Sequence, residues 1–339
     1  MPTHTTAPPV PTTVLGLTPE FTDPLWRVPV RLTPVEIELL RTEPLRRLHF
    51  VTHGGASTLT TLQSYSRLEH TLGVLSLAAH FHPDDRLLRL AALLHDIGHL
   101  PLSHTFEGVA GLDHHAIGSA LLHADPIRPL LERHGIDPAA VASLLDGQSP
   151  SPLLGRPGLM NLDHLDSFVR SGRAAGHLDA DPAALLTRLD LHDTVVSTDH
   201  DTAATLITLV RGEARLHTSW NNVGPVSVLR RLAARLLDHT PTLTPARLAR
   251  LTDPHLWTAL DTCPATCDET HRIRYEPHRL TVTATPTSTR PSGWTYSLRK
   301  IYNSAPLLDG RPISTAAPAL AAELDALSRL PTHFHVHWA

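Results

Sequence analysis

An apolar helical stretch that ends in a histidine and an aspartate constrains the fold of this chain more than any other feature. Residues 86–94 carry leucine and alanine at helical spacing, and His95 and Asp96 follow directly. Gly98 and Pro101 prevent the helix from continuing much further. Burying an imidazole beside a carboxylate is costly unless a charged partner receives both. Because manganese, iron, zinc, magnesium and cobalt accept such ligands, the pair predicts a divalent metal site.

A second helix is predicted over residues 66–82, with a cation and an imidazole on its inward face. Arg67 and His70 are three positions apart, and apolar residues occupy the same face one and two turns later. His70 is therefore a candidate ligand for the same metal.

A third helical segment, residues 160–170, carries polar side chains on one face. They stand at i, i+3, i+4 and i+7 and are Asp163, Asp166, Ser167 and Arg170. Asp163 is the candidate fourth ligand.

In these segments the chain resembles the HD phosphohydrolase superfamily, and more narrowly its deoxynucleoside triphosphate triphosphohydrolase branch. The resemblance is strongest over residues 20–176. It is carried by Asp23-Pro24, Leu32-Thr33-Pro34, Leu45-Arg46-Arg47-Leu48, Arg67-Leu68-Glu69-His70-Thr71-Leu72-Gly73-Val74 and His95-Asp96-Ile97-Gly98-His99-Leu100-Pro101-Leu102-Ser103-His104, followed by Glu107 and His115. Near the C-terminus, Arg299-Lys300-Ile301-Tyr302 is compatible with the same branch.

The resemblance implies a role for each matched residue. It implies that the metal is held by His70, His95, Asp96 and Asp163. It implies that His99 and Glu107 form a proton-transfer pair, and that substrate or phosphate contacts come from Arg67, His115, Asp166, Ser167 and Arg170. Such a set suits hydrolysis, because a cation polarises a phosphoryl oxygen while an imidazole moves a proton near neutral pH.

Other histidines have simpler explanations. His99 is alternatively a cation that stabilises a helix C-terminus. His104 is alternatively a hydrogen-bonded residue of the core. Surface or local polar positions are predicted for His80, His82, His114, His123 and His164.

The chain departs from that branch where a sugar would bind. Ser167 stands where an aromatic residue is common, Ser171 where a polar or acidic partner is usual, and Thr52 near the position of a glutamine. Since an aromatic ring against deoxyribose excludes a 2′-hydroxyl by shape, serine should open the pocket. We therefore expect ribose and deoxyribose substrates to react similarly, and a non-nucleotide phosphate ester is a further candidate.

Residues 206–237 form a long helical stretch in which the branch supplies further phosphate and sugar contacts. Arg211 and Arg215 are secondary candidates, together with His217 and Trp220. The alternative is a solvated helix face, since two arginines four positions apart are typical of one.

The hydrophobic pattern predicts a mainly α fold, which the resemblance identifies as an HD-domain helical bundle with a small C-terminal antiparallel β element. Besides the helix with Asp163, helices are expected over residues 34–49, 66–82, 86–97, 113–134, 137–146, 181–190, 201–237 and 244–251. Strands are expected over 280–284, 294–299 and 332–338, with a helix over 317–330. The predicted parts are a flexible tail (1–19), a helical catalytic domain (20–255) and an α+β extension packed on it (256–339).

Composition limits the partners. The formal charge of −4, from 29 basic and 33 acidic residues, gives no field that favours polymeric nucleic acid. Lys300 is the single lysine, and the arginine excess indicates coding bias rather than phosphate recognition. No segment reaches the length of a membrane span without interruption, and residues 1–18 lack a signal-peptide pattern. We therefore expect no membrane partner.

The cysteines predict a reducing compartment. Two in a chain of 339 residues argue against a disulfide scaffold, so a cytoplasmic location is expected. Cys263, Cys267 and His271 have the spacing of a small zinc site if helical, but Pro264 and the missing fourth ligand count against one.

We expect a metal-dependent phosphohydrolase that cleaves a phosphate ester or anhydride of a nucleotide-like small molecule, and the resemblance implies a homo-oligomer. One alternative is an HD-fold di-iron oxygenase, for which His99, His104 and His115 would supply the extra imidazoles. The other is a non-catalytic nucleotide sensor, against which the retention of every presumed ligand argues.

Overall fold

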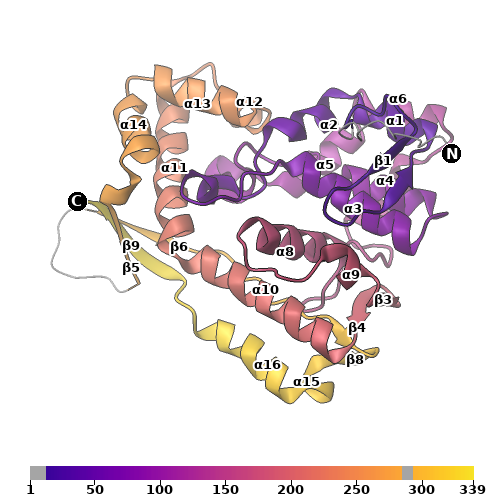
Figure 1. Ribbon diagram of the computed structural model, residues 1–339. Coiled ribbons are helices and arrows are strands. Elements are labelled where there is room, and N and C mark those ends of the chain that lie inside the picture. The colour runs from indigo at the N-terminus through magenta and orange to yellow at the C-terminus, as the bar shows by residue number, and fades with distance from the viewer. Residues whose placement is uncertain (1–12, 285–292) are drawn as a thin grey trace, which may run out of the picture.

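The computed structural model describes residues 13–284 and 293–339, and it is mainly helical, as the sequence predicts (Figure 1). At its centre α3 (Arg67–Phe81) packs against α4 (Arg86–Leu94) on one side and α8 (Leu162–Ala174) on the other. The next layer is α10 (His200–Thr218), which packs on α8. Each of these four helices buries an apolar face against its neighbour. This packing brings together the segments that carry His70, His95 and Asp163.

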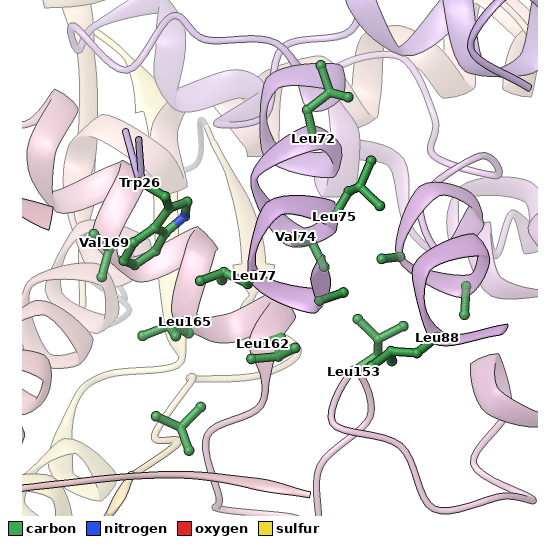
Figure 2. Close-up of a cluster of buried hydrophobic side chains, with 14 of the residues drawn as sticks. Trp26, Leu72, Val74, Leu75, Leu77, Leu88, Leu153, Leu162, Leu165 and Val169 are labelled. Atoms are coloured by element: carbon green, nitrogen blue, oxygen red, sulfur yellow. The ribbon is translucent and has the colours of Figure 1, made fainter. Parts of the chain in front are cut away.

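The core around α3 is continuous with both flanking helices. Figure 2 shows α3 side chains between two groups of apolar residues, one from α8 and one around Leu88 and Leu153. The buried side chains of α3 and α8 in this view are Leu72, Val74, Leu75, Leu77, Leu162, Leu165 and Val169. Trp26 joins them from the loop between the first two strands and is 1% exposed.

Three helices predicted as continuous are interrupted. The 34–49 stretch divides into α1 (Pro34–Leu40) and α2 (Glu43–Arg47), and 113–134 into α5 (His114–Leu122) and α6 (Ile127–Arg133). The 201–237 stretch divides at Ser219, whose extended backbone ends α10 and begins α11 (Trp220–His239). Proline explains the second break, since Pro126 cannot donate a hydrogen bond inside a helix.

The remaining helices lie close to their predicted positions or were not predicted. Those expected are α7 (Pro138–Leu145), α9 (Pro182–Leu186), α12 (Pro245–Ala249) and α16 (Pro318–Asp325). Those not expected are α13 (Asp253–Thr262), α14 (Cys267–Tyr275) and the short α15 (Ile313–Ala316).

The predicted C-terminal sheet is confirmed. It is antiparallel with the order β5-β9-β6, so β9 (His333–Trp338) lies between β5 (Leu280–Thr283) and β6 (Trp294–Ser297). Two other sheets were missed. One is the β1 (Glu20–Thr22) and β2 (Pro29–Arg31) pair, and the other has the order β3-β4-β7-β8. The four strands of this second sheet are β3 (Leu189–His192), β4 (Val195–Thr198), β7 (Leu307–Leu308) and β8 (Arg311–Pro312).

The C-terminal region divides between two hydrophobic cores. Leu320 and Leu324 of α16 join the core around α3, whereas Phe334 and Val336 of β9 join a second core built on α11, α13 and α14. The predicted boundary between residues 255 and 256 therefore does not coincide with a boundary between cores. Within residues 13–284 and 293–339, no helix has both the length and the apolar character needed to cross a bilayer.

A close backbone contact joins the turn after α4 to the first turns of α5. A Cβ atom on Gly98 would lie 2.1 Å from the carbonyl oxygen of His114 and 2.3 Å from the backbone nitrogen of Gly118. Any side chain at position 98 would therefore push α5 away. The contact holds His114 against the segment that follows His95 and Asp96.

We predict that Gly98→Ala lowers the free energy of unfolding by about 1–3 kcal/mol, the usual cost of overpacking. Gly118→Ala is the matched control, since its Cβ would meet Gly98 at an ordinary 3.6 Å. Alanine inside a helix should leave stability unchanged or raise it by up to about 1 kcal/mol. Urea denaturation measures both, and equal stabilities of the two variants would contradict the contact.

Candidate metal centre

The first turn of α3 fixes the position of the first ligand. The Ser66 side chain accepts a hydrogen bond from the backbone N–H of Glu69, and the Glu69 carboxylate accepts one from the backbone N–H of Ser66 at 2.8 Å. This capping box sets where the helix begins. His70 consequently lies one turn inside α3, fully buried and facing α8.

All four predicted ligands converge. The Nε2 atom of His70 is 3.3 Å from Nε2 of His95 and 3.0 Å from Oδ1 of Asp163. Oδ2 of Asp96 is 3.3 Å from Nε2 of His95 and 3.6 Å from Nε2 of His70. Such separations suit donors that share one cation at about 2.0–2.2 Å. The ligands come from α3, the end of α4 and α8.

Hydrogen bonds on the far side of each imidazole leave its Nε2 free for a metal. His95 donates from Nδ1 to the carbonyl oxygen of Ala92 at 2.8 Å, and Nδ1 of His70 is 2.8 Å from Oδ2 of Asp166. Partners of this kind fix the ring orientation of metal-binding histidines. Two imidazoles and two carboxylates therefore fit a divalent cation, and their metal-binding role stays a prediction.

Asp166 and Arg170 lie behind the ligands instead of facing a substrate, which corrects their expected place. Asp166 is fully buried and accepts hydrogen bonds from Arg170 and, at 2.6 Å, from Nε1 of Trp26. Arg170 also pairs with Asp23 at 2.9 Å. Burial opposes ionisation of Asp166, but Arg170 and His70 outweigh it and lower the pKa of that carboxyl to about 2. The two residues therefore orient His70.

Arg67 is likewise engaged by the protein. Its guanidinium lies 3.2 Å from Oδ2 of Asp96 and donates to Ser103 Oγ at 3.2 Å and to the carbonyl oxygen of His53 at 3.1 Å. The side chain is buried. The phosphate contact expected of Arg67 is replaced by a contact with a predicted ligand.

Three histidines gather on the other side of Asp96. Potential ligand atoms of His99, His104 and His114 lie within 4.8 Å of one another, and Nε2 of His99 is 3.0 Å from Oδ1 of Asp96. We call these residues the histidine cluster. Burial and the charge of Arg67 hold the pKa of His99 well below its usual range, so that imidazole is neutral. His104 is exposed, which opens the cluster to solvent.

The cluster corrects two predictions. Glu107 pairs with His114, from Oε1 to Nδ1 at 2.6 Å, and not with His99, whose ring stacks on His114 at 4.3 Å. His114, predicted to be a local polar residue, is buried, whereas His115 is exposed. Asp113 caps α5 and could have shown which of the two histidines begins the helix.

His53 is a residue that the sequence analysis missed. Its ring stacks on Tyr65 at 4.9 Å and lies 4.6 Å from the His70 ring. Nδ1 of His53 is 3.0 Å from the Tyr65 hydroxyl, and Nε2 is 3.4 Å from Oγ of Ser167. His53 is therefore the neighbour of the short Ser167 side chain. No motif pointed to it, because it lies in an irregular loop.

The positions expected near a sugar carry hydrogen bonds within the protein. Thr52 donates from Oγ1 to Asp253 at 2.8 Å. Ser171 accepts from Gln63 and donates to Glu213, each at 2.5 Å, and His217 lies 3.1 Å from the same carboxylate.

The secondary candidates lie elsewhere. Arg211 pairs with Glu323 of α16, and Arg215 lines the same hollow of about 320 Å³ between α10 and α16. Arg215 is exposed and fits the solvated-face alternative, whereas Arg211 forms an ion pair with a neighbouring helix. Among the described residues, Cys263, Cys267 and His271 do not form a group of potential ligands.

Part of the chain is similar in sequence to known proteins. Residues 67–149 match the family described as HD domain. The human protein described as deoxynucleoside triphosphate triphosphohydrolase SAMHD1 is 27% identical over 151 residues, 37% of this chain and 24% of that protein. Ribonuclease Y of Acidothermus cellulolyticus is 33% identical over 132 residues, 37% of this chain and 25% of that protein.

The fold has a structural neighbour of similar length. The crystal structure of a phosphohydrolase from Bacteroides thetaiotaomicron has a TM-score of 0.70 and 16% identity, covering 94% of this chain and 99% of that one. The curated relatives are longer, since the chain spans 24–34% of their length.

We predict that Asp166→Asn weakens manganese binding by about 10–100-fold, the usual effect of removing a partner behind a ligand. Calorimetric titration of metal-free protein with manganese measures this. Ser167→Ala, one position along the same helix, should bind as the wild type does. Equal affinity of both variants would show that Asp166 does not position His70.

Glu213 predicts a pH dependence of stability. Burial opposes its ionisation, but His217 and Ser171 outweigh burial and lower the pKa of the carboxyl. A folded-state pKa below the unfolded one stabilises the protein at neutral pH, and this contribution is lost as pH falls below about 4.5. Glu213→Gln should therefore lose less stability than the wild type on acidification. Parallel pH profiles in urea denaturation would refute this.

Proposed function

Because the chain belongs to the HD-domain phosphohydrolase superfamily, we propose that it is a metal-dependent phosphohydrolase that cleaves a phosphate ester or anhydride of a nucleotide-like small molecule. The observation that carries the proposal is the convergence of His70, His95, Asp96 and Asp163 directly beside the histidine cluster. Metal ligands and proton-transfer groups thus meet at one carboxylate, Asp96.

The protein's own side chains supply acid–base chemistry next to the ligands. When bound, a divalent cation polarises a phosphoryl oxygen and lowers the pKa of water. Glu107 accepts the Nδ1 hydrogen of His114, which leaves Nε2 of His114 as the atom that gives or takes a proton. Neutral His99 is buried beside it, and its Nδ1 has no hydrogen-bond partner among the described residues. Because Nε2 of His99 faces Oδ1 of Asp96 at 3.0 Å, the single proton of the neutral ring belongs on Nε2, and Nδ1 is a hydrogen-bond acceptor.

Sugar preference in this proposal depends on two neighbours. His53 lies 3.4 Å from Ser167, where a sugar pocket was expected to open, and its ring stacks on Tyr65. The family's aromatic residue would stand on α8 at the position of Ser167, and neither His53 nor Tyr65 belongs to that helix. We therefore retain the expectation that ribose and deoxyribose substrates react similarly. A homo-oligomeric state and a cytoplasmic location also stay predictions from the sequence.

The di-iron oxygenase alternative keeps one supporting observation. Asp96 directs Oδ2 toward His95 and Oδ1 toward His99, so a carboxylate lies between two groups of potential ligands. Two irons per chain with substrate-dependent oxygen uptake would favour this alternative. A sensor would bind nucleotide tightly without any product.

We expect the manganese-loaded protein to release phosphate or polyphosphate from at least one nucleotide. The screen covers nucleoside mono-, di- and triphosphates of both sugars, with products resolved by mass. Asp96→Ala should abolish release, because it removes a ligand. Glu107→Gln should lower kcat by about 10²–10⁴-fold at unchanged metal content, the usual contribution of an acid–base pair. A fully metal-loaded wild type that is inactive on the whole panel would contradict the proposal.

A further inference from the structure

The cations predicted to bind phosphate are neutralised by carboxylates of the protein. Arg67 pairs with Asp96, and Arg170 pairs with Asp166 and Asp23. Arg211, on α10, pairs with Glu323. Asp163 and Glu107 add further negative charge around the ligands. A phosphate substrate is itself an anion, so cations from another part of the chain are needed.

Residues 299–304, between β6 and β7, reach both sides of the centre, and we call them the C-terminal segment. At one end, Nη1 of Arg299 lies 4.0 Å from Oε2 of Glu107. At the other end, Ser304 Oγ is 2.8 Å from Nδ1 of His164, the residue next to the ligand Asp163. The Tyr302 ring lies between, 5.6 Å from the His164 ring. The segment therefore spans from the histidine cluster to the metal ligands.

Two adjacent cations of this segment stay open to solvent. The Arg299 side chain is 65% exposed, and its contact with Glu107 is long for an ion pair. Arg230 already donates to the carbonyl oxygens of Thr105 and Glu107, which holds the Glu107 loop without Arg299. Lys300 is exposed and forms no ion pair within the described part of the chain. Both charges are available for a ligand.

Tyr302 orients the lysine. The Lys300 Nζ atom lies 4.6 Å from the centre of the Tyr302 ring, a distance at which an ammonium is attracted to a ring face. Lys300 is also the single lysine among 29 cationic residues. An ammonium is a compact point charge with three donors, whereas the guanidinium of Arg299 binds two oxygens at once. Each of the two cations suits the oxygens of a phosphate group.

We propose that Arg299 and Lys300 bind the phosphate groups of the substrate, the task that the sequence assigned to Arg67 and Arg170. The inference rests on the proposed function, since it concerns the same centre. Arg299 lies on the side of the proton-transfer pair, and Lys300 lies on the side of Asp163. The C-terminal segment thereby belongs to the substrate site.

The test titrates inorganic phosphate into the manganese-loaded full chain by calorimetry. Arg299→Ala and Lys300→Ala should each raise the phosphate Kd by about tenfold, the loss expected for one charge-assisted hydrogen bond. Lys300→Arg keeps the charge and should bind within about threefold of the wild type. Arg329→Ala removes an exposed arginine elsewhere in the C-terminal region and is the matched control. Metal content, measured on every variant, should not change.

The outcomes separate this inference from the proposed function. Phosphate binding that depends on both residues, without hydrolysis of any substrate, would leave the inference standing and overturn the function. Hydrolysis with the same phosphate Kd and KM in the wild type and both alanine variants would overturn the inference alone. A wild type that binds no phosphate would also overturn the inference. If hydrolysis is found, we expect KM to rise and kcat to stay within about threefold of the wild type.

Discussion

The hydrogen bond between His70 and Asp166 is the interaction on which the centre depends. Asp166 is fully buried, and its charge is balanced by Arg170, which in turn pairs with Asp23. Removing one member would leave an uncompensated buried charge, which costs about 3–5 kcal/mol. The network extends from the loop before β2 to α3 and α8. The same contacts therefore fix both the orientation of His70 and the packing of these three segments.

The same network sets how closely α3 approaches α8. A Cβ atom on Gly73 would lie 2.0 Å from Oδ1 of Asp166 and 2.2 Å from a guanidinium nitrogen of Arg170. Glycine is therefore required for the two helices to pack at this distance. The glycine in the Arg67 to Val74 motif therefore reflects this packing.

The sequence and its family resemblance were sufficient to predict the helices with strong apolar periodicity and the convergence of His70, His95, Asp96 and Asp163. The sequence was insufficient to predict how far from the exposed end of a helix a given side chain lies. Asp163 and Asp166 share a face, but Asp163 lies in the first turn of α8, partly exposed, whereas Asp166 lies one turn deeper. Periodicity gives the direction of a side chain and does not give its distance from the end of a packed helix. The resemblance implied that Asp166 and Arg170 contact the substrate, and helical spacing alone could not show that they lie behind His70.

Adjacent identical residues caused the other error. His114 and His115 differ by one position, which on a helix separates their directions by about 100°. Only the start of α5 at Asp113 decides which imidazole points toward Glu107. The strands β3 and β4 pair with each other as a hairpin of two short strands, and β3 begins inside the stretch expected to be helical up to residue 190. β4 pairs with β7, more than a hundred residues later, and a local pattern carries no record of such a neighbour.

Asp96 has one oxygen toward the predicted metal ligands and the other toward the histidine cluster. When a cation or a proton binds one oxygen of this carboxylate, the negative charge on the other oxygen decreases. The two halves of the centre are therefore thermodynamically linked, and the linkage is reciprocal. An anion held by the cluster and a cation held by the ligands would each alter the affinity for the other, through a single side chain and without any movement of the backbone.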